Sequence, residues 1–260
     1  MTPRRAVVGG GSSGLGYAVA ESLASQGCDL LLWARSDTSL QKAAASIQTS
    51  HPDIQLAVVA ADASRPEAAA RIADAAMHLW GGADILILNS GGPPACAPDE
   101  TDADGWRAAL QLLTVTPIDL ATRLLPAMRS ARWGRIIAVL STGVREPLAD
   151  LSYSNGGRAA LAAWLKTIAS EVAVDEVTVN GILPGRIDTD RVTHLDTLRA
   201  AATKSTLESV RAQSSASIPV GRYGRAQEFA AVAAFLASEA ASYVTGSFFS
   251  CDGGLARGRW

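Results

Sequence analysis

Short apolar segments alternate with longer alanine-rich segments along the whole chain, and this alternation restricts the fold more than any other feature of the sequence. Most of the short segments are continuously apolar, which is typical of strands that are covered on both faces. The longer segments have the period of helices. Repeated strand–helix–strand units of this kind form a parallel sheet between two layers of helices. We therefore predict an α/β fold with a doubly wound, mostly parallel, seven-stranded sheet and helices on both faces.

The pattern assigns approximate bounds to each element. The expected strands are 5–8, 29–33, 55–60, 85–89, 134–140, 178–183 and 247–251. The expected helices lie near 15–26, 38–50, 66–80, 102–130, 155–174, 196–215 and 226–239. Pro126 predicts a kink or a break near the end of its helix, because proline has no N–H to donate. Since no Ser/Gly-rich linker or low-complexity tract divides the chain, we expect residues 1–260 to form a single domain.

Charge and composition exclude several classes of protein. The 23 basic and 25 acidic residues give a net charge of −2, so no overall cationic field is available to bind nucleic acid. Apolar runs such as 230–237 are far shorter than the ~18–20 residues that span a membrane. The three cysteines and three histidines lack the spacing of metal ligands, so we expect no metal. We predict a soluble, cytoplasmic protein that acts on a small molecule.

A glycine-rich segment, Gly9 to Gly16, lies between the first expected strand and the first expected helix. Glycines let the chain turn sharply and let its backbone approach a ligand. The helix that begins there presents unpaired N–H groups, which bind anions such as the diphosphate of a dinucleotide. The alternative is a tight glycine turn that binds nothing.

This segment resembles the short-chain dehydrogenase/reductase family, whose Gly-x-x-x-Gly-x-Gly pattern matches Gly10, Gly14 and Gly16. Further segments along nearly the whole chain resemble the family: Asp62, 89–92, Pro184–Gly185 with Thr189, and 252–254. The altered catalytic positions described below resemble its divergent 3-oxoacyl-reductase-like branch. The resemblance implies a Rossmann-type fold with a dinucleotide at the carboxyl ends of the strands. It assigns cofactor contacts to Gly10, Ser12, Ser13, Gly14, Leu15, Gly16, Arg35, Asp62, Ala63, Asn89, Gly91, Arg158, Pro184, Gly185 and Thr189.

The end of the second expected strand indicates which nicotinamide cofactor is used. No acidic residue stands there to bond the ribose 2′-hydroxyl of NAD, and Arg35 offers a cation that suits a 2′-phosphate. Asp37, which follows the end of this strand, is an acidic residue that would instead favour NAD. We predict NADP (NADPH) in preference to NAD.

The catalytic positions depart from the family pattern. Ser141 matches the family's serine at the end of the fifth strand. The family's Tyr-x-x-x-Lys pair, in which the lysine lowers the tyrosine pKa for proton transfer, falls on Ser154 and Arg158. Tyr153 is adjacent but would point to another face of the helix, unless the start of the helix is irregular. The position of the family's asparagine falls on Leu113.

Three functions remain open. The first is a divergent NADP-dependent reductase of a carbonyl, imine or enone, with its proton supplied by Tyr153, by water, or by a loop group such as Asp150, Asp188 or His194. The second is a non-redox enzyme, a lyase or cyclase, on the same fold. The third is a cofactor-binding protein with little catalysis.

The segment 186–218 matches the part of the family that covers the substrate. We interpret it either as a lid or as an ordinary helix packed on the rim of the site. Arg145 and Arg186 are candidates to bind a carboxylate or phosphate of the substrate. The long helices 106–128 and 155–174 are those through which family members pair, so the resemblance implies a homodimer or homotetramer.

Overall fold

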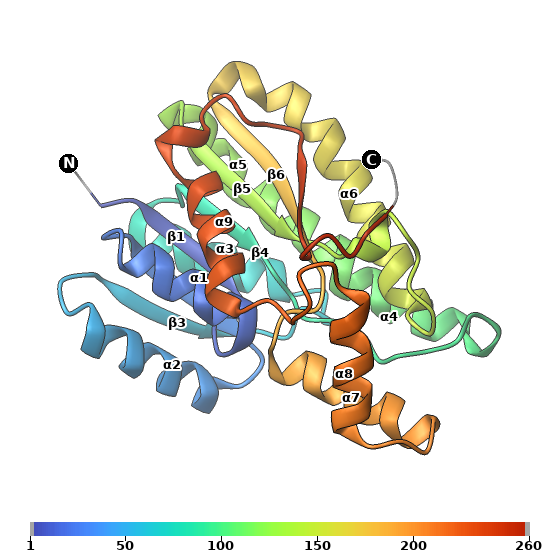
Figure 1. Cartoon of the computed structure of the whole chain (residues 1–260). Helices are drawn as coiled ribbons and strands as arrows, with labels where there is room; N and C mark the ends of the chain where they lie inside the picture. The colour runs from blue at the N-terminus through green and yellow to red at the C-terminus, as the bar shows by residue number, and fades with distance from the viewer. Residues whose placement is uncertain (1–2, 258–260) are drawn as a thin grey trace.

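Seven parallel strands form the sheet in the computed structural model of the chain, which describes residues 3–257 (Figure 1). Their order is β3-β2-β1-β4-β5-β6-β7. The strands are β1 Arg5–Gly9, β2 Asp29–Ala34, β3 Leu56–Ala60, β4 Ile85–Leu88, β5 Gly134–Val139, β6 Val177–Pro184 and β7 Phe248–Cys251. The predicted fold class is confirmed, and each strand lies within one or two residues of its predicted bounds.

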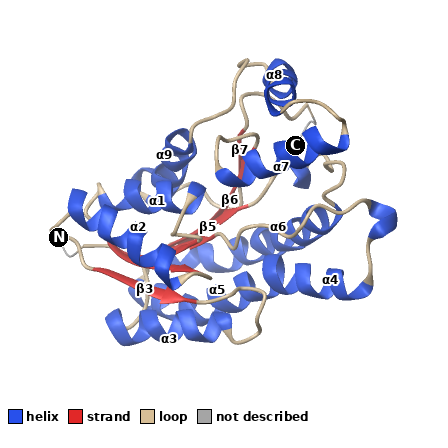
Figure 2. Ribbon diagram, turned by 90° about the horizontal axis from the view of Figure 1, so that it is seen from below, coloured by secondary structure: helices blue, strands red, loops and turns tan. Residues whose placement is uncertain are grey.

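Helices cover both faces of the sheet (Figure 2). One face packs against α1 (Gly14–Ala24), α2 (Asp37–Ser50) and α9 (Ala226–Ala237). The other packs against α3 (Ala68–Trp80), α5 (Thr116–Ala131) and α6 (Ser152–Val172). Two separate apolar clusters result, one on each side of the strands, as expected where continuously apolar strands are buried on both faces.

The strand order reverses direction at β1, which pairs with β2 on one side and β4 on the other. At such a reversal the loops that leave neighbouring strands turn to opposite faces of the sheet, which opens a crevice at the strands' carboxyl ends. The glycine-rich segment and the loops after β4, β5 and β6 all lie at this edge.

The expected helix 102–130 consists of α4 (Ala103–Leu110), a π-helical turn (Gln111–Val115) and α5. Pro126 lies inside α5 and does not end it. The carbonyl that proline leaves without a donor is that of Thr122, four residues earlier. Both residues are exposed, so water can satisfy this carbonyl.

The expected helix 196–215 is instead a pair of helices, α7 (Asp190–Ala202) and α8 (Leu207–Ser217). The turn between them contains Lys204 in the left-handed region, with φ of 52°. Thr206 then begins α8, because its hydroxyl accepts a hydrogen bond from the Ser209 N–H at 3.1 Å. The prediction of one helix was wrong because this internal N-cap was not recognised.

One helical run among the described residues, Ala103–Ala131, is long and apolar enough to cross a membrane when judged by length and composition alone. Its side chains Leu120, Leu124 and Met128 are buried in the apolar cluster between the sheet and the helices. This packing is that of a core helix.

Candidate active site

Glycines shape the turn between β1 and α1. Gly10 and Gly14 have φ of 61° and 55°, a region that side chains rarely adopt. A Cβ on Gly16 would lie 2.3 Å from the Gly10 carbonyl oxygen, so only glycine lets α1 pack this closely on the strand end. Ser13 precedes the helix, and its side chain makes no capping hydrogen bond. The first N–H groups of α1 are therefore available to an anion.

A cavity of about 1110 Å³ runs along the carboxyl edge of the sheet from this turn to α6 and α7. Its volume exceeds the ~300–1,000 Å³ of ordinary small-molecule pockets, which suits a dinucleotide with a substrate beside it. Every residue predicted to contact the cofactor lines it, apart from Gly16, which lies behind the turn; of the residues predicted to act on the substrate, Ser141, Ser154, Arg158, Asp150 and Arg186 line it, whereas Tyr153, Arg145, Asp188 and His194 do not. Together with the uncapped start of α1, this lining fits a dinucleotide.

Arg35 and Asp62 line one end of the cavity, after β2 and β3. Burial opposes ionisation of Asp62, but hydrogen bonds from the N–H and hydroxyl of Ser64, with the charges of Arg35 and Arg65, lower its pKa. Arg35 is exposed and makes no ion pair within 4 Å of a described carboxylate. This end of the cavity therefore carries a cation that a ligand phosphate can engage.

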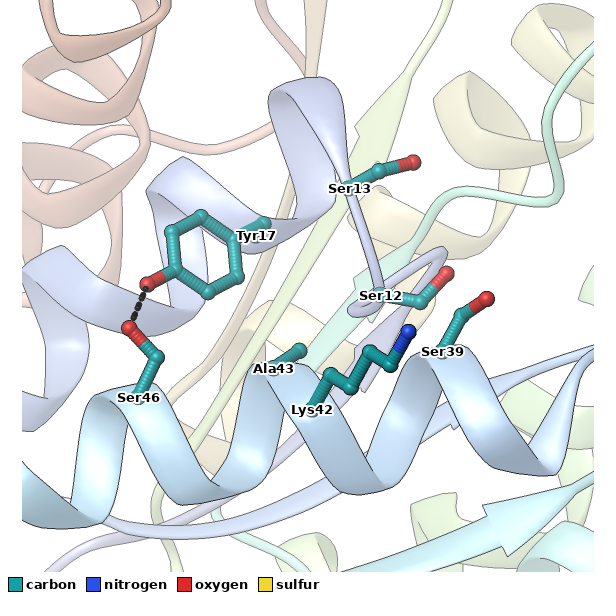
Figure 3. Close-up of a pocket in the computed structure, with 7 residues that line it drawn as sticks. All are labelled: Ser12, Ser13, Tyr17, Ser39, Lys42, Ala43 and Ser46. Atoms are coloured by element: carbon teal, nitrogen blue, oxygen red, sulfur yellow. Dashed lines mark hydrogen bonds between the residues drawn. The ribbon is translucent and has the colours of Figure 1, made fainter.

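A second cavity of about 390 Å³ adjoins this end between α1 and α2 (Figure 3). Lys42 extends along α2 toward Ser12 and Ser39, and on the other side Tyr17 hydrogen-bonds Ser46 at 3.0 Å. Ser12, Ser13 and Ser39 line both cavities. Like Arg35, Lys42 makes no ion pair within residues 3–257. Lys42, which lies more than one helical turn beyond the start of α2, was not predicted from the sequence.

Asn89 connects the end of β4 to the glycine turn. Its side-chain amide donates to the Gly9 carbonyl at 3.2 Å, and a Cβ on Gly10 would lie 2.6 Å from its Nδ2. Asn89 therefore fixes the turn in addition to lining the cavity.

Ser141 follows β5 and lines the cavity. Its Oγ accepts a hydrogen bond from the Gly143 N–H at 3.0 Å. Because that bond uses a lone pair, the hydroxyl hydrogen remains available to a ligand oxygen.

Ser154 and Arg158 are four residues apart on α6 and share one face of the helix. Arg158 Nε lies 3.4 Å from Ser154 Oγ, and Nη2 donates to the Gly91 carbonyl at 2.6 Å. Burial, with a smaller contribution from the nearby charge of Arg191, lowers the pKa of Arg158 to about 10. Arg158 is thus a cation at neutral pH and is held beside the Ser154 hydroxyl.

Tyr153 points away from the cavity. Its hydroxyl accepts a hydrogen bond from the Asp102 N–H at 2.9 Å, and its ring packs edge-on against Trp106 at 5.1 Å. The helix begins regularly at Ser152, so the ~100° between successive residues separates Tyr153 from Ser154. The structure therefore gives no support to Tyr153 as a proton donor and corrects that expectation.

Leu113 lies in the π-helical turn and does not line the cavity. It packs beneath α6, where a Cβ on Gly157 would lie 2.9 Å from its Cδ1. The next residue, Thr114, donates its hydroxyl to the Gly157 carbonyl at 2.8 Å. This position thus supports α6 and contributes no polar group to the site.

Of the other proposed proton sources, only Asp150 lines the cavity. Asp188 instead forms an ion pair with Arg211 at 2.8 Å, and His194 is exposed on α7 away from the cavity lining.

Arg145 and Arg186 are engaged elsewhere. Arg145 donates to the Phe248 carbonyl at 2.9 Å. Arg186 reaches the cavity wall, but its guanidinium pairs with the fully buried carboxylate of Asp196, which also accepts the Tyr223 hydroxyl at 2.8 Å. Arg145 does not line the cavity, and the guanidinium of Arg186 already pairs with a carboxylate, so neither is placed to serve as the anion site expected from the sequence.

Two other arginines on α7, Arg191 and Arg199, line the cavity and were missed. The sequence did indicate a shared helix face, since the lining residues of α7 have helical spacing: 191, 195, 198, 199 and 202. This face was not recognised because the predicted bounds of the helix were incorrect. Residues 3–257 contain no group of three or more His, Cys, Asp or Glu side chains suited to hold a metal ion.

A doubly wound sheet with an anion-binding glycine turn and a serine at the end of its fifth strand defines a dinucleotide-dependent class of enzymes. Residues 10–256 match a family model described as enoyl-(acyl carrier protein) reductase. The chain belongs to the short-chain dehydrogenase/reductase family.

Similar proteins include the NADPH-dependent reductase BacG of Bacillus subtilis, 34% identical over 256 residues and 98% of each chain. The structure of L-sorbose reductase from Gluconobacter frateurii, complexed with NADPH and L-sorbose, has a TM-score of 0.94 and 31% identity, covering 100% of this chain and 98% of that one. An NADPH-bound oxidoreductase from Pseudomonas aeruginosa PAO1, described as containing an atypical catalytic center, has a TM-score of 0.87 and 30% identity, covering 98% of each chain.

Proposed function

We propose that this protein is an NADPH-dependent reductase of a carbonyl, imine or enone group in a small molecule, in which Ser154 and Arg158 replace a tyrosine–lysine pair. One observation carries the proposal: Ser141, Ser154 and Arg158 line the same cavity as the glycine turn and Arg35. The similar reductases support oxidoreductase chemistry over a lyase or a purely binding role.

The preference for NADPH rests on charge. Arg35 lines the main cavity just after β2, Lys42 lines the adjoining smaller cavity from the second turn of α2, and neither pairs with a described carboxylate. The 2′-phosphate of NADPH provides the anion that both can bind, and NADH lacks it. The uncapped start of α1 binds the diphosphate, and Asn89 keeps the turn in place.

NADPH, when bound, supplies the hydride that reduces the substrate. Negative charge then develops on the substrate oxygen, and a group that is already oriented toward this charge stabilises it best. The Ser141 hydroxyl donates a hydrogen bond to that oxygen. Arg158 adds a fixed positive charge close by.

The proton reaches the substrate oxygen through Ser154. A serine hydroxyl is a weak acid, but a guanidinium 3.4 Å away favours any negative charge that it acquires. Water replaces the proton, so Ser154 acts as a relay. The atypical catalytic center described for the Pseudomonas aeruginosa oxidoreductase is a precedent for a departure from the usual residues.

We also propose that the protein acts in the cytoplasm as a homodimer or homotetramer. Leu110 and Val115 leave apolar surface exposed near the junction of α4 and α5. Light scattering after gel filtration tests this, and a monomer at micromolar concentration would contradict it.

The function is tested by NADPH oxidation with a panel of ketones, imines and enones. Turnover of at least one substrate is expected for the wild-type protein. Ser141→Ala and Ser154→Ala should each lower kcat by roughly tenfold or more, since general acid–base and oxyanion interactions contribute ~10²–10³-fold. Failure of the whole panel despite tight NADPH binding would reject the reductase and leave a binding protein.

A further inference from the structure

The helix α7 lies beyond the carboxyl ends of the strands (Figure 1). One face of α7 lines the main cavity and forms a wall of it. Leu195 and Leu198 lie at its centre, and Arg191 and Arg199 lie on either side of them along the helix. The arginines are eight residues apart, which corresponds to about 12 Å at 1.5 Å per residue. The wall therefore combines an apolar patch with a cation at each end.

Arg191 is the arginine at the reactive end. Its Nη2 donates to the Pro93 carbonyl at 2.7 Å, and its charge acts on Arg158. Burial lowers the pKa of Arg191 itself. Asp150 and Asp190 line the same cavity, but within residues 3–257 no carboxylate lies within 4 Å of the Arg191 guanidinium.

Two neighbouring guanidinium groups without a carboxylate leave uncompensated positive charge in a partly buried space. Such an arrangement is costly for the protein alone and becomes favourable when an anion enters. The planar guanidinium of Arg191 uses one N–H for Pro93 and has others left to bind a carboxylate.

We propose that Arg191 binds a carboxylate of the substrate, so that the protein reduces short oxo acids whose apolar part packs on Leu195 and Leu198. The inference rests on the proposed reductase function. Because Arg158 and Arg191 are neighbours, the carboxylate stands within a few bonds of the carbonyl held by Ser141 and Ser154.

The competing anion is the cofactor diphosphate. Thr189, two residues before Arg191, lies 3.7 Å from the position that a Cβ on Gly14 would take, so the diphosphate site is close. The two anions are distinguished by measuring both ligands. A cofactor role for Arg191 predicts a change in the Kd of NADPH, whereas a substrate role predicts a change for the oxo acid alone.

The probes are α-ketoisocaproate and methyl isobutyl ketone, which share the branched apolar part and the carbonyl and differ by a carboxylate against a methyl group. Calorimetric titration into protein saturated with NADP⁺ measures binding without turnover. Wild-type protein should bind the acid about tenfold to a hundredfold more tightly than the ketone, the range of a charge-assisted hydrogen bond. Arg191→Gln should remove this difference and leave the Kd of NADPH within about twofold.

Two variants serve as controls. Arg191→Lys keeps the charge and should restore part of the preference for the acid, whereas Arg199→Gln removes the equivalent charge about 12 Å away and should leave it intact. Equal affinity of the two probes, no binding of the acid, or an unchanged preference in Arg191→Gln would overturn the proposal. A weaker NADPH complex with an unchanged preference would assign Arg191 to the diphosphate. Failure of the reductase function would appear separately, as absent NADPH oxidation alongside Arg191-dependent binding of the acid.

Discussion

Removal of the two cations at the junction of the cavities should change cofactor preference in a calculable way. Arg35→Ala and Lys42→Met each take away a charge that lines this junction and pairs with no described carboxylate. A hydrogen bond to a charged group contributes about 1.5–3 kcal/mol. Both side chains are exposed and therefore screened by salt, so we take about 1–2 kcal/mol for each.

This free energy corresponds to roughly a fivefold to thirtyfold weaker Kd for NADPH in each single variant. The double variant should lose less than the sum, because both cations act on one phosphate and such contributions are not additive. The Kd of NADH should stay within about twofold throughout, since NADH has no 2′-phosphate. Raising the ionic strength should reduce the difference between wild type and variants.

Quenching of tryptophan fluorescence measures these constants, because Trp33 lines the main cavity. Arg71→Ala is the matched control, since it removes an exposed arginine from α3, which lies on the opposite face of the sheet from α2. An unchanged Kd for NADPH in both single variants, or an equal weakening of NADH, would refute the assignment of these cations to the 2′-phosphate.

Four further outcomes are expected. Tyr153→Phe should lower the free energy of unfolding by about 1–3 kcal/mol, because the Asp102 N–H loses its acceptor, and should leave kcat nearly unchanged. A large loss of kcat, with a Tm equal to that of the wild type, would show that Tyr153 takes part in catalysis. Gly16→Ala should cost about 1–3 kcal/mol or more, since the new Cβ would lie 2.3 Å from a backbone oxygen, and a wild-type Tm would contradict this packing. Activity should fall as pH rises through about 10, where Arg158 loses its proton. In the unfolded chain the pKa of Arg158 has its ordinary, higher value, so deprotonation of Arg158 favours the folded state as the pH rises above about 10. The titration of Arg158 therefore cannot lower activity by unfolding the protein. Arg191→Gln should move the alkaline limb of the pH–rate profile upward by removing a like charge; a limb that stays in place would refute the coupling.

The sheet was predictable because its strands are marked twice, by continuous apolar residues and by the turns that follow them. The glycine turn was predictable for the same reason, since a strand, a glycine run and a helix occur together only in few contexts. The division between α7 and α8 was not, because Lys204 adopts a positive φ that its residue type does not indicate. Only Thr206 marked the start of the second helix.

Within the site, helical geometry alone brought Ser154 and Arg158 to one face and placed Tyr153 on another, but Tyr153 stayed a candidate until the structure showed a regular start of α6 at Ser152. The roles of Arg145 and Arg186 could not be judged in that way. Arg145 bonds a strand more than one hundred residues away, and Arg186 pairs with Asp196 on the following helix, so only the folded chain shows these partners. Lys42 was missed because the absence of a carboxylate partner is also a property of the folded chain, whereas Arg191 was missed because the predicted helix began only at residue 196 and α7 begins at Asp190.

The buried carboxylate of Asp196 limits how α7 can move. Leaving a buried charge without its partner costs about 3–5 kcal/mol, so a helix that swung outward and left Asp196 unpaired would be populated in only about one molecule in 150 to one in 5,000. We therefore expect α7 to stay in place during the reaction and not to open as a lid. Substrate and product would then enter and leave the cavity past the carboxyl end of α7, near the turn at Lys204. Mutations that speed product release should lie in this turn.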